Sequence, residues 1–233
     1  MSNRRTRILS NSYKRPTAEG VARALAPFGI DCSPEIAAHV LQYMDLLIQW
    51  NQKFNLTSLR DPEQVLTRHF GESFFAASSL DMSKGRLADV GSGAGFPGLA
   101  LKLLRPHLEV ALIEANAKKA AFLSEVIRKL GVQDVEVLRA RLDATNLRAG
   151  SLDFITARAV GHLDELLKWS HRVLRPGGRI VLWLGKEAIE ELLHYPQWEW
   201  QAPIPIPLSE RRFLLIGKPA PDPSKQAGAA TSS

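Results

Sequence analysis

Two patterns of hydrophobic and polar positions divide the chain. Over residues 18–80 the apolar positions recur every three or four residues, the period of an amphipathic helix. From residue 85 onward, short apolar runs alternate with segments of helical period. The first pattern predicts an all-helical front segment, and the second predicts strands that alternate with helices.

The front segment contains three predicted helices. The first covers residues 18–27 and is stopped by a proline and a glycine. The second begins after Ser33, a good N-cap that is followed by proline at the first helical position. The third begins after Asp61, with Gln64 at the position of a capping box, and continues to about residue 80.

In the second part of the chain, the hydrophobic pattern predicts five strands and the helices between them. The strands are expected at residues 86–90, 108–113, 135–138, 152–156 and 179–184. The helices are expected at residues 97–104, 116–130, 163–174 and 187–193. Residues 204–207 and 212–216 are predicted to form a closing antiparallel hairpin, and Trp198 and Trp200 fall in an irregular segment that covers the sheet edge.

Alternating strands and helices indicate an α/β fold with a doubly wound, mostly parallel sheet and right-handed crossovers. Such sheets bind ligands outside the carboxyl ends of their strands. Residues 91–96, 114, 139–142 and 156–160 each follow a predicted strand, so we expect them to surround one crevice.

The sequence Asp-Val-Gly-Ser-Gly-Ala-Gly-Phe-Pro-Gly, residues 89–98, ends the first predicted strand and opens a helix. Glycines let a backbone approach a ligand closely, and the N-terminus of a helix attracts the negatively charged part of that ligand. The stretch contains G-x-G-x-x-G, so nicotinamide and flavin dinucleotides are alternatives to S-adenosylmethionine. Glu114 suits the ribose of either kind of cofactor.

Asp89 favours S-adenosylmethionine, because a carboxylate before the glycines repels a pyrophosphate but suits an ammonium and a sulfonium. The turn Arg-Pro-Gly-Gly before the fifth strand, at residues 175–178, is also common in enzymes that use this cofactor. The alternative role of the Asp89 carboxylate is to accept hydrogen bonds from N–H groups of the loop.

The net charge of +6 and the pI of about 9.6 are those of a basic protein. Residues 1–20 carry five basic side chains and one acidic one, which gives +5 − 1 = +4. Residues 1–16 are expected to be a basic flexible arm, which either reaches for RNA phosphates or keeps the protein soluble.

Cysteine and histidine usage argues against disulfides and metals. Cys32 is the only cysteine, and the six histidines are scattered, so we expect no disulfide and no metal site. A single cysteine fits a reducing cytoplasm. The basic, polar N-terminus lacks the apolar stretch of a secretory signal, so we expect none there, and no apolar run reaches the roughly 20 residues that span a bilayer.

Four separate motifs occur in a specific order. They are Asn55-Leu56-Thr57, Arg68-His69 with Ser73 four residues later, the glycine stretch at residues 89–98, and Ala157-Arg158-Ala159. In this combination the chain, from about Ile36 to Leu193, resembles the family of ribosomal RNA small subunit methyltransferase G, also called glucose-inhibited division protein B. That resemblance implies a class I methyltransferase sheet with an N-terminal helical extension, and methylation of guanine N7 in 16S ribosomal RNA with S-adenosylmethionine.

The resemblance also implies a domain plan and a set of cofactor contacts. The helical extension would cover residues 17–82 and the methyltransferase domain residues 83–217. Independently of the resemblance, residues 218–233 are rich in proline, alanine and serine, and this composition predicts a disordered tail. Gly91 and Phe96 would line the cofactor, and Gly93 and Gly95 would shape the loop. Glu114 would bind the ribose, Ala140 and Arg141 would lie beside the adenine, and Arg158 would stand at the mouth of the site.

The chain departs from the family pattern at three positions. Arg141 stands where an acidic residue is usual, so a side-chain bond to the adenine amine is lost or reversed. Glu72 replaces the usual aspartate before Ser73. The order Gly185-Lys186 is the reverse of the usual Lys-Gly, which weakens the assignment of Lys186 to the substrate.

Methylation of guanine N7 needs no general base, because N7 carries a lone pair and no proton. Alignment alone supplies roughly 7–11 kcal/mol in favourable cases. No catalytic acid or base is therefore predicted, and Arg158 is the one candidate for a direct role. Asn55, Arg60, Arg68, His69 and Lys186 are the candidates for contact with RNA. For His69, a hydrogen-bonded structural role is favoured over contact with a base.

Two rival functions stay open at this point. One is methylation of a protein or a small molecule, against which the basic arm and the Asn55–Ser73 motifs count. The other is a non-catalytic RNA-binding assembly factor, which Arg141 favours because the acidic adenine contact is missing. No hydrophobic surface stripe demands a partner, so a monomer is expected.

Overall fold

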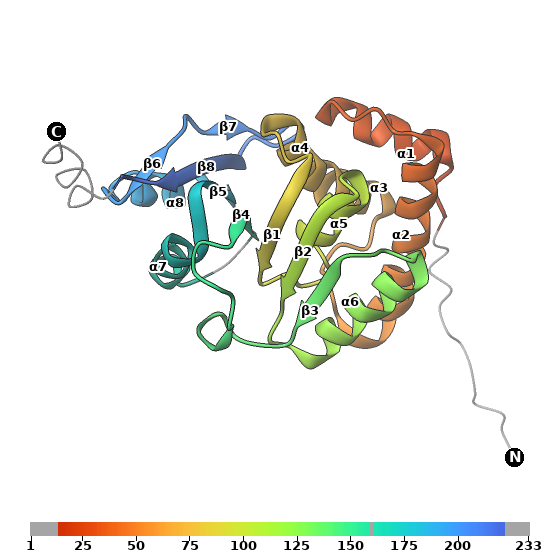
Figure 1. The fold of residues 1–233 in the computed structure, drawn as a ribbon. Coiled ribbons are helices and arrows are strands. Elements are labelled where there is room, and N and C mark those ends of the chain that lie inside the picture. The colour runs from red at the N-terminus through yellow and green to blue at the C-terminus, as the bar shows by residue number, and fades with distance from the viewer. Residues whose placement is uncertain (1–13, 159–160, 222–233) are drawn as a thin grey trace, which may run out of the picture.

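The fold is described from a computed structural model, which defines residues 14–158 and 161–221 (Figure 1). Most of the predicted arm (1–16) and tail (218–233) lies outside the described residues. So do residues 159–160 of the predicted crevice. Two described parts differ from the prediction: Arg15 pairs with Asp45 at 2.9 Å, and the last strand extends through Pro219.

The front segment folds into helices, as predicted. They are α1 (Ala18–Leu25), η1 (Ala26–Phe28), α2 (Pro34–Phe54), α3 (Pro62–Gln64), η2 (Val65–Gly71) and α4 (Glu72–Ser79). The expected caps are present: Ser33 Oγ accepts from the Ile36 N–H and Asp61 Oδ2 from the Gln64 N–H. A π-helical turn, η2, interrupts the third predicted helix. The hydrophobic period does not reveal it, because one extra residue in a turn scarcely changes that period.

The second part forms one sheet with the strand order β3-β2-β1-β4-β5-β8-β6, and β7 pairs with β8. Its strands are β1 (Lys84–Val90), β2 (His107–Ile113), β3 (Val135–Leu138), β4 (Leu152–Arg158), β5 (Leu174–Leu184), β6 (Trp198–Trp200), β7 (Ile204–Pro205) and β8 (Phe213–Pro219). Strands β1 to β5 are parallel, and β8 runs antiparallel to β5. The mostly parallel sheet and the hairpin of β7 and β8 confirm the sequence prediction.

Two strand predictions were wrong. β5 begins at Leu174, because Leu174 already pairs with Leu152 and residues 175–178 form a bulge before the register resumes at Arg179. The segment predicted as irregular is strand β6, which pairs with the end of β8. The rings of Trp198 and Trp200 stack on each other at the sheet edge, 5.4 Å apart.

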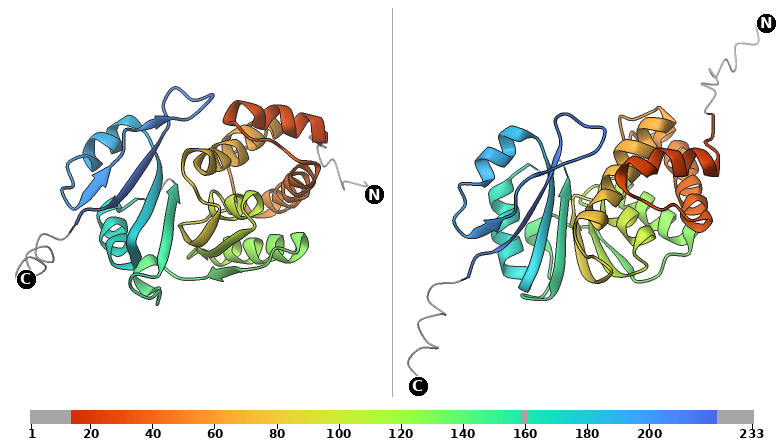
Figure 2. Two further views of the ribbon diagram at one scale, coloured as in Figure 1. Left: turned by 45° about the horizontal axis from the view of Figure 1, so that its top comes forward. Right: turned by 90° about the horizontal axis from the view of Figure 1, so that it is seen from above.

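Helices cover both faces of the sheet (Figures 1 and 2). On one side α5 (Gly98–Leu104) and α6 (Ala117–Leu130) pack on β1 to β3, and the front helices pack on α5 and α6. On the other side lie α7 (Leu163–Val173) and α8 (Lys186–Leu192), with the short η3 (Leu142–Ala144) between β3 and β4. Phe70 and Phe74 of the front segment share one buried cluster with Leu99 and Phe122. The front helices and the sheet therefore have a common core.

Within the described ranges, no helix is both long enough and apolar enough to cross a bilayer.

Candidate active site

The glycine loop lies between β1 and α5, at the carboxyl edge of the sheet. Gly91, Gly93 and Gly95 have φ angles of 70°, 57° and 90°, a region that favours glycine. A Cβ on Gly93 would meet only the Gly91 carbonyl, at 3.7 Å, so the loop is open on that side. A Cβ on Gly95 would lie 1.9 Å from the Tyr43 hydroxyl. Gly91 and Gly93 thus face the crevice, whereas Gly95 makes room for the helices behind the loop.

Asp89 is fully buried at the end of β1. Its Oδ1 accepts a hydrogen bond from Thr156 Oγ1 at 2.7 Å, and its Oδ2 accepts one from the Gly98 N–H at 3.1 Å. Burial raises the pKa of Asp89 to about 6, although these hydrogen bonds oppose the shift. The geometry favours the alternative role for Asp89: its carboxylate joins β1, β4 and the start of α5, and it presents no surface to a ligand.

Glu114 follows β2 and closes the crevice beside the loop. Its Oε2 accepts a hydrogen bond from the Gly93 N–H at 2.8 Å, and its Oε1 accepts one from the Asn116 N–H at 2.7 Å. Each carboxylate oxygen has two lone pairs, so both keep acceptor capacity. The side chain is thus fixed beside Gly93 and can still accept hydrogen bonds from hydroxyl groups.

Ala140 and Arg141 follow β3, the strand next to β2. The Glu114 N–H donates to the Leu138 carbonyl at 3.0 Å, which brings the ends of the two strands together. The Ala140 N–H donates to the same carbonyl at 2.9 Å, so this amide is already hydrogen-bonded within the chain. Arg141 is exposed and precedes η3, which leaves its side chain free to turn toward solvent.

The ring of Phe96 packs beneath the loop, and the predicted contact of Phe96 with the cofactor stays a prediction. Its side chain is 7% exposed, and the rings of Tyr43 and His69 lie nearly parallel to it at 5.3 and 4.4 Å. Phe70 packs edge-on against it at 5.0 Å. The Tyr43 hydroxyl also donates to the Ala94 carbonyl at 2.7 Å. The aromatic cluster therefore ties α2 and η2 to the loop.

His69 joins two of the sequence motifs. Its Nε2 lies 2.9 Å from Thr57 Oγ1, while the Asn51 amide bonds both the N–H and the carbonyl of Thr57. Burial, together with the charges of Arg158 and Arg68, lowers the pKa of His69 to about 3. His69 is thus a neutral, hydrogen-bonded structural residue, the role favoured for it from the sequence.

Arg158, at the end of β4, belongs to a buried cluster of charges. Its Nη2 lies 3.1 Å from Glu72 Oε2, and its Nη1 donates to the Arg68 carbonyl at 2.7 Å. Arg212, at the start of β8, reaches the other Glu72 oxygen at 2.6 Å. One carboxylate thus faces two guanidinium groups, and Arg68 lies beside them. Arg158 is mostly buried and held in place, with 17% of its side chain exposed.

The remaining RNA candidates lie at the surface and are not all together. Arg60 Nη2 donates to Asn55 Oδ1 at 3.3 Å, and both residues are exposed beyond the end of α2. Lys186 follows β5, is 77% exposed, and lies 3.9 Å from Glu190. Lys186 begins α8, whereas Asn55 and Arg60 lie beyond the end of α2.

Two residues of this site, Tyr43 and Arg212, had no role predicted from the sequence, and Thr156 was predicted at the crevice without its partner. The sequence does contain a signal for the role of Tyr43. A tyrosine on a buried helix face normally finds a hydrogen-bond partner for its hydroxyl. For Thr156 and Arg212 the signal is missing, since their partners Asp89 and Glu72 lie far away in the sequence.

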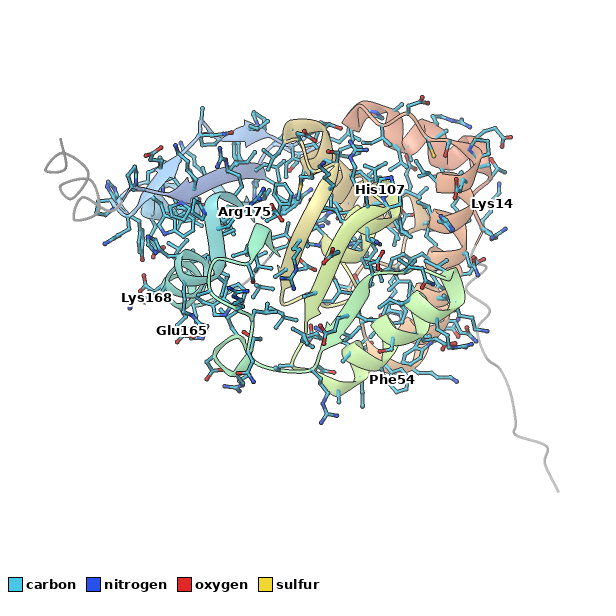
Figure 3. All side chains as sticks on the ribbon, viewed as in Figure 1. Lys14, Phe54, His107, Glu165, Lys168 and Arg175 are labelled. Carbon is cyan, nitrogen blue, oxygen red and sulfur yellow. The ribbon has the colours of Figure 1, made fainter. Side chains whose placement is uncertain are left out.

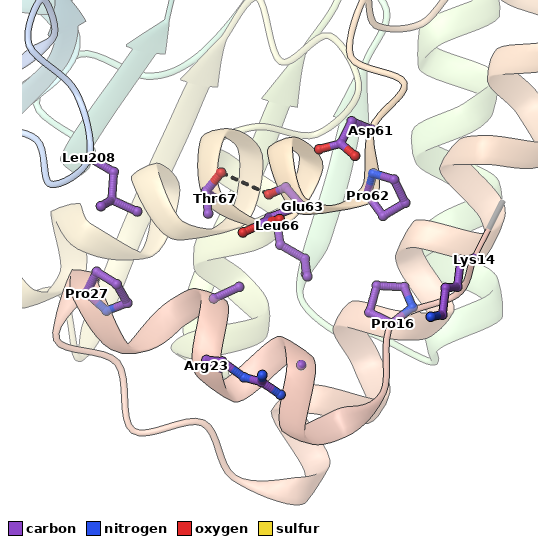
Figure 4. Close-up of a pocket in the computed structure, with 12 residues that line it drawn as sticks. Lys14, Pro16, Arg23, Pro27, Asp61, Pro62, Glu63, Leu66, Thr67 and Leu208 are labelled. Carbon is purple, nitrogen blue, oxygen red and sulfur yellow. Dashed lines mark hydrogen bonds between the residues drawn. The ribbon is translucent and has the colours of Figure 1, made fainter.

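A cavity of about 490 Å³ lies elsewhere, between α1 and η2 (Figure 4). Charged residues of both signs line it, among them Arg23 and Glu63. None of the candidate residues for cofactor or RNA lines it, so it is separate from the crevice.

The strand order, the glycine loop and the carboxylate after β2 define the class of S-adenosylmethionine-dependent methyltransferases. Among solved structures, a methyltransferase of this class from Aquifex aeolicus has the same fold, with a TM-score of 0.58, 18% identity, and coverage of 70% of this chain and 96% of that one. The YcgJ protein from Bacillus subtilis has a TM-score of 0.55, 14% identity, and coverage of 66% and 100%.

The family model described as rRNA small subunit methyltransferase G matches residues 36–201, and the chain belongs to this family. Proteins named ribosomal RNA small subunit methyltransferase G are similar over most of their length. The one from Chloroflexus aggregans is 39% identical, with 85% of this chain and 88% of that protein covered. The one from Stenotrophomonas maltophilia is 38% identical, with 87% and 95% covered. The chain is therefore a methyltransferase that uses S-adenosylmethionine.

Proposed function

We propose that this protein transfers a methyl group from S-adenosylmethionine to N7 of a guanine in the 16S ribosomal RNA of the small ribosomal subunit. The observation that carries this proposal is the family match over residues 36–201, which covers strands β1 to β6 and most of the helical extension. A match confined to the sheet would support only the class of enzyme. The substrate is inferred from the family, because its members are named for the small-subunit ribosomal RNA that they methylate.

The residues of the crevice fit the cofactor. The side of Gly93 that a Cβ would fill is open, so the backbone can approach a ligand there. Glu114 is fixed beside it with acceptor capacity for the ribose hydroxyls. We assign the cofactor to Gly91, Gly93, Glu114 and the segment Ala140-Arg141, with Asp89 and Gly95 holding the loop in shape. When bound, S-adenosylmethionine supplies an electrophilic methyl group on a positively charged sulfur.

The task of the protein is then to position the guanine, because N7 has no proton to lose. His69 is uncharged at neutral pH and its Nε2 is bonded to Thr57, which suits a structural role better than proton transfer. Arg158 is fixed by Glu72 and by the Arg68 carbonyl at the mouth of the crevice, where a held guanidinium can orient an RNA group. Alignment of this kind is sufficient for a displacement that needs no base.

RNA would reach the crevice across the surface that carries Asn55, Arg60 and Arg68, while Lys186 stays a weaker candidate. Asn55 and Arg60 are exposed and Arg68 is half-buried. Cations and amides of this type bind phosphates and unpaired bases. We further propose that the protein acts in the cytoplasm as a monomer and without a metal ion. The proposal of a monomer is supported by the distribution of exposed apolar side chains. Among the described residues, the large hydrophobic side chains that are more than a third exposed lie on separate elements, at Phe54, Leu193 and Leu208.

One assay tests the proposal. The protein is incubated with labelled S-adenosylmethionine and small ribosomal subunits from a strain that lacks the modification, and the RNA is digested to nucleosides. Label in 7-methylguanosine is the expected result. Label in another nucleoside or in protein would refute the guanine-N7 assignment, and absence of cofactor binding by calorimetry would identify a non-catalytic factor.

A further inference from the structure

Phe54, the last residue of α2, is an aromatic side chain that the fold leaves open to solvent. It is 38% exposed. Its ring packs against Trp50 with 5.4 Å between the centroids, and Trp50 packs in turn on the fully buried Phe122 at 5.6 Å. Phe54 is thus braced from the core while part of its ring stays accessible. A braced ring loses little conformational entropy when a ligand stacks on it.

The position of Phe54 is set by the antiparallel packing of α2 and α6. At one end of this pair, Gln42 Nε2 donates to the Lys129 carbonyl at 3.1 Å. At the other end, Phe54, which Figure 3 shows at the lower edge of the molecule, lies against Lys118, in the first turn of α6. That turn follows Glu114 and Asn116, the residues that close the crevice beside Gly93. Phe54 therefore stands at the crevice end of the molecule.

The surroundings of Phe54 are cationic. Lys118 Nζ lies 5.5 Å from the centre of the ring, and Lys118 is exposed. Lys53 precedes Phe54, and Arg60 reaches Asn55, which follows it. Exposed aromatic rings among lysines and arginines are the means by which proteins hold unpaired nucleotides, with stacking for the base and cations for the phosphate.

We propose that Phe54 and Lys118 form a platform on which an unpaired base of the RNA substrate stacks, close to the methylated guanine. The base takes the open part of the Phe54 ring, and the flexible, exposed Lys118 moves its ammonium group to the adjoining phosphate. Base-paired RNA does not suit this platform, because its base faces are covered by stacking. The proposal rests on the proposed function, since it names how the same crevice holds its RNA.

The test compares Phe54→Ala, Phe54→Tyr and Lys118→Gln with the wild-type protein, using small subunits that lack the modification. Phe54→Ala is expected to raise KM for the subunit about 5- to 20-fold, in the lower part of the range for loss of one stacked base, and to change kcat less than twofold. Phe54→Tyr keeps the ring and should restore KM. The affinity of the protein for a single-stranded RNA oligonucleotide should fall with salt concentration. In Lys118→Gln the slope of this dependence should be smaller by the equivalent of about one phosphate contact.

The control is Leu193→Ala, which removes a 50% exposed apolar side chain at the end of α8, on the other side of the sheet. Its KM should stay unchanged, as should the affinity of every variant for S-adenosylmethionine by calorimetry. The platform is refuted if Phe54→Ala keeps the wild-type KM while the wild-type protein forms 7-methylguanosine. It is also refuted if Phe54→Ala binds intact subunits worse but the oligonucleotide equally well, which would indicate a ribosomal protein as the partner. Failure of the wild-type protein itself to form 7-methylguanosine would instead refute the proposed function.

Discussion

The hydroxyl of Tyr43 donates a hydrogen bond to the carbonyl oxygen of Ala94, with 2.7 Å between the two oxygens. Tyr43 belongs to α2 and Ala94 to the glycine loop, so the bond crosses from the helical extension to the cofactor crevice. It is fully buried, and the Tyr43 ring also stacks on Phe96 at 5.3 Å. The shape of the loop therefore depends on a residue about 50 positions earlier in the chain.

The first prediction follows from the contact between Gly95 and Tyr43. Gly95→Ala places a Cβ 1.9 Å from the tyrosine oxygen, at a φ of +90°, and should unfold the protein or weaken cofactor binding at least tenfold. Gly150→Ala is the matched control, because Gly150 has a φ of +64° and open space around it. It should cost about 1–2 kcal/mol of stability through backbone strain alone. Thermal unfolding and calorimetry with S-adenosylmethionine measure both variants, and equal costs would contradict the proposed crowding.

The second prediction concerns Glu114 as the ribose contact. Glu114→Gln keeps one acceptor oxygen but replaces the other with an N–H donor, which opposes the Gly93 N–H that now lies 2.8 Å from Oε2. We expect the affinity for S-adenosylmethionine to fall by about 2 kcal/mol, since hydrogen bonds to charged groups contribute about 1.5–3 kcal/mol. The matched control is Glu136→Gln, which changes an exposed carboxylate of β3. Unchanged affinity in Glu114→Gln would remove Glu114 from the site.

The third prediction is a dependence of stability on pH through His69. The pKa of His69 is about 3 in the folded protein and 6.5 for an unperturbed histidine, so the unfolded chain binds more protons between these pH values. Stability from this group is complete above pH 6.5 and is lost as the pH falls below it. Between pH 7 and pH 5 the loss should be about 2 kcal/mol.

His69→Gln removes this titration and should flatten that part of the curve of unfolding free energy against pH. Asp89, whose pKa rises from 3.8 to about 6, acts in the opposite sense over much of the same range. Its unfavourable ionisation in the folded state lowers stability as the pH rises from 4 to 6. Because both proteins contain Asp89, its contribution cancels in the difference between them. Parallel curves for wild type and His69→Gln would contradict the buried, neutral histidine.

The fourth prediction tests the charge cluster. Glu72→Gln leaves Arg158 and Arg212 buried together without their shared carboxylate, and removal of one partner from a buried ion pair costs about 3–5 kcal/mol. Glu199→Gln removes the exposed partner of Lys218 and should cost less than about 1 kcal/mol. Chemical unfolding of the two variants gives the comparison. A cost for Glu72→Gln no greater than that for Glu199→Gln would show that the arginines do not depend on Glu72.

Local sequence signals predicted the elements, because caps, turns and hydrophobic periods act over a few residues. Asn116 illustrates this: its side chain accepts hydrogen bonds from the Lys118 and Lys119 N–H groups and starts α6 where expected. Strand β6 was missed because the alternation of Trp198, Glu199 and Trp200 covers only three residues, which is too short a run to indicate a strand. Its pairing depends on the distant β8, where Gly217 leaves room for the Trp200 ring.

The site was predicted in part for the same reason. The positions of Gly93 and Glu114 follow from their places after β1 and β2, which the strand pattern fixes. The direction of a side chain is set by long-range packing: the ring of Phe96 is covered by Tyr43 and His69, both from the helical extension. Sequence position alone does not tell a residue above the loop from one below it.

The core that the front helices share with the sheet has a consequence for how the enzyme is built. Removal of the helices would expose the faces of α5 and α6 that Phe70 and Phe74 now cover. A truncated protein that begins near residue 82 therefore should not be an active enzyme. Heating should melt both parts in a single calorimetric transition, and the chain gains its hold on RNA and its catalytic crevice in the same folding event.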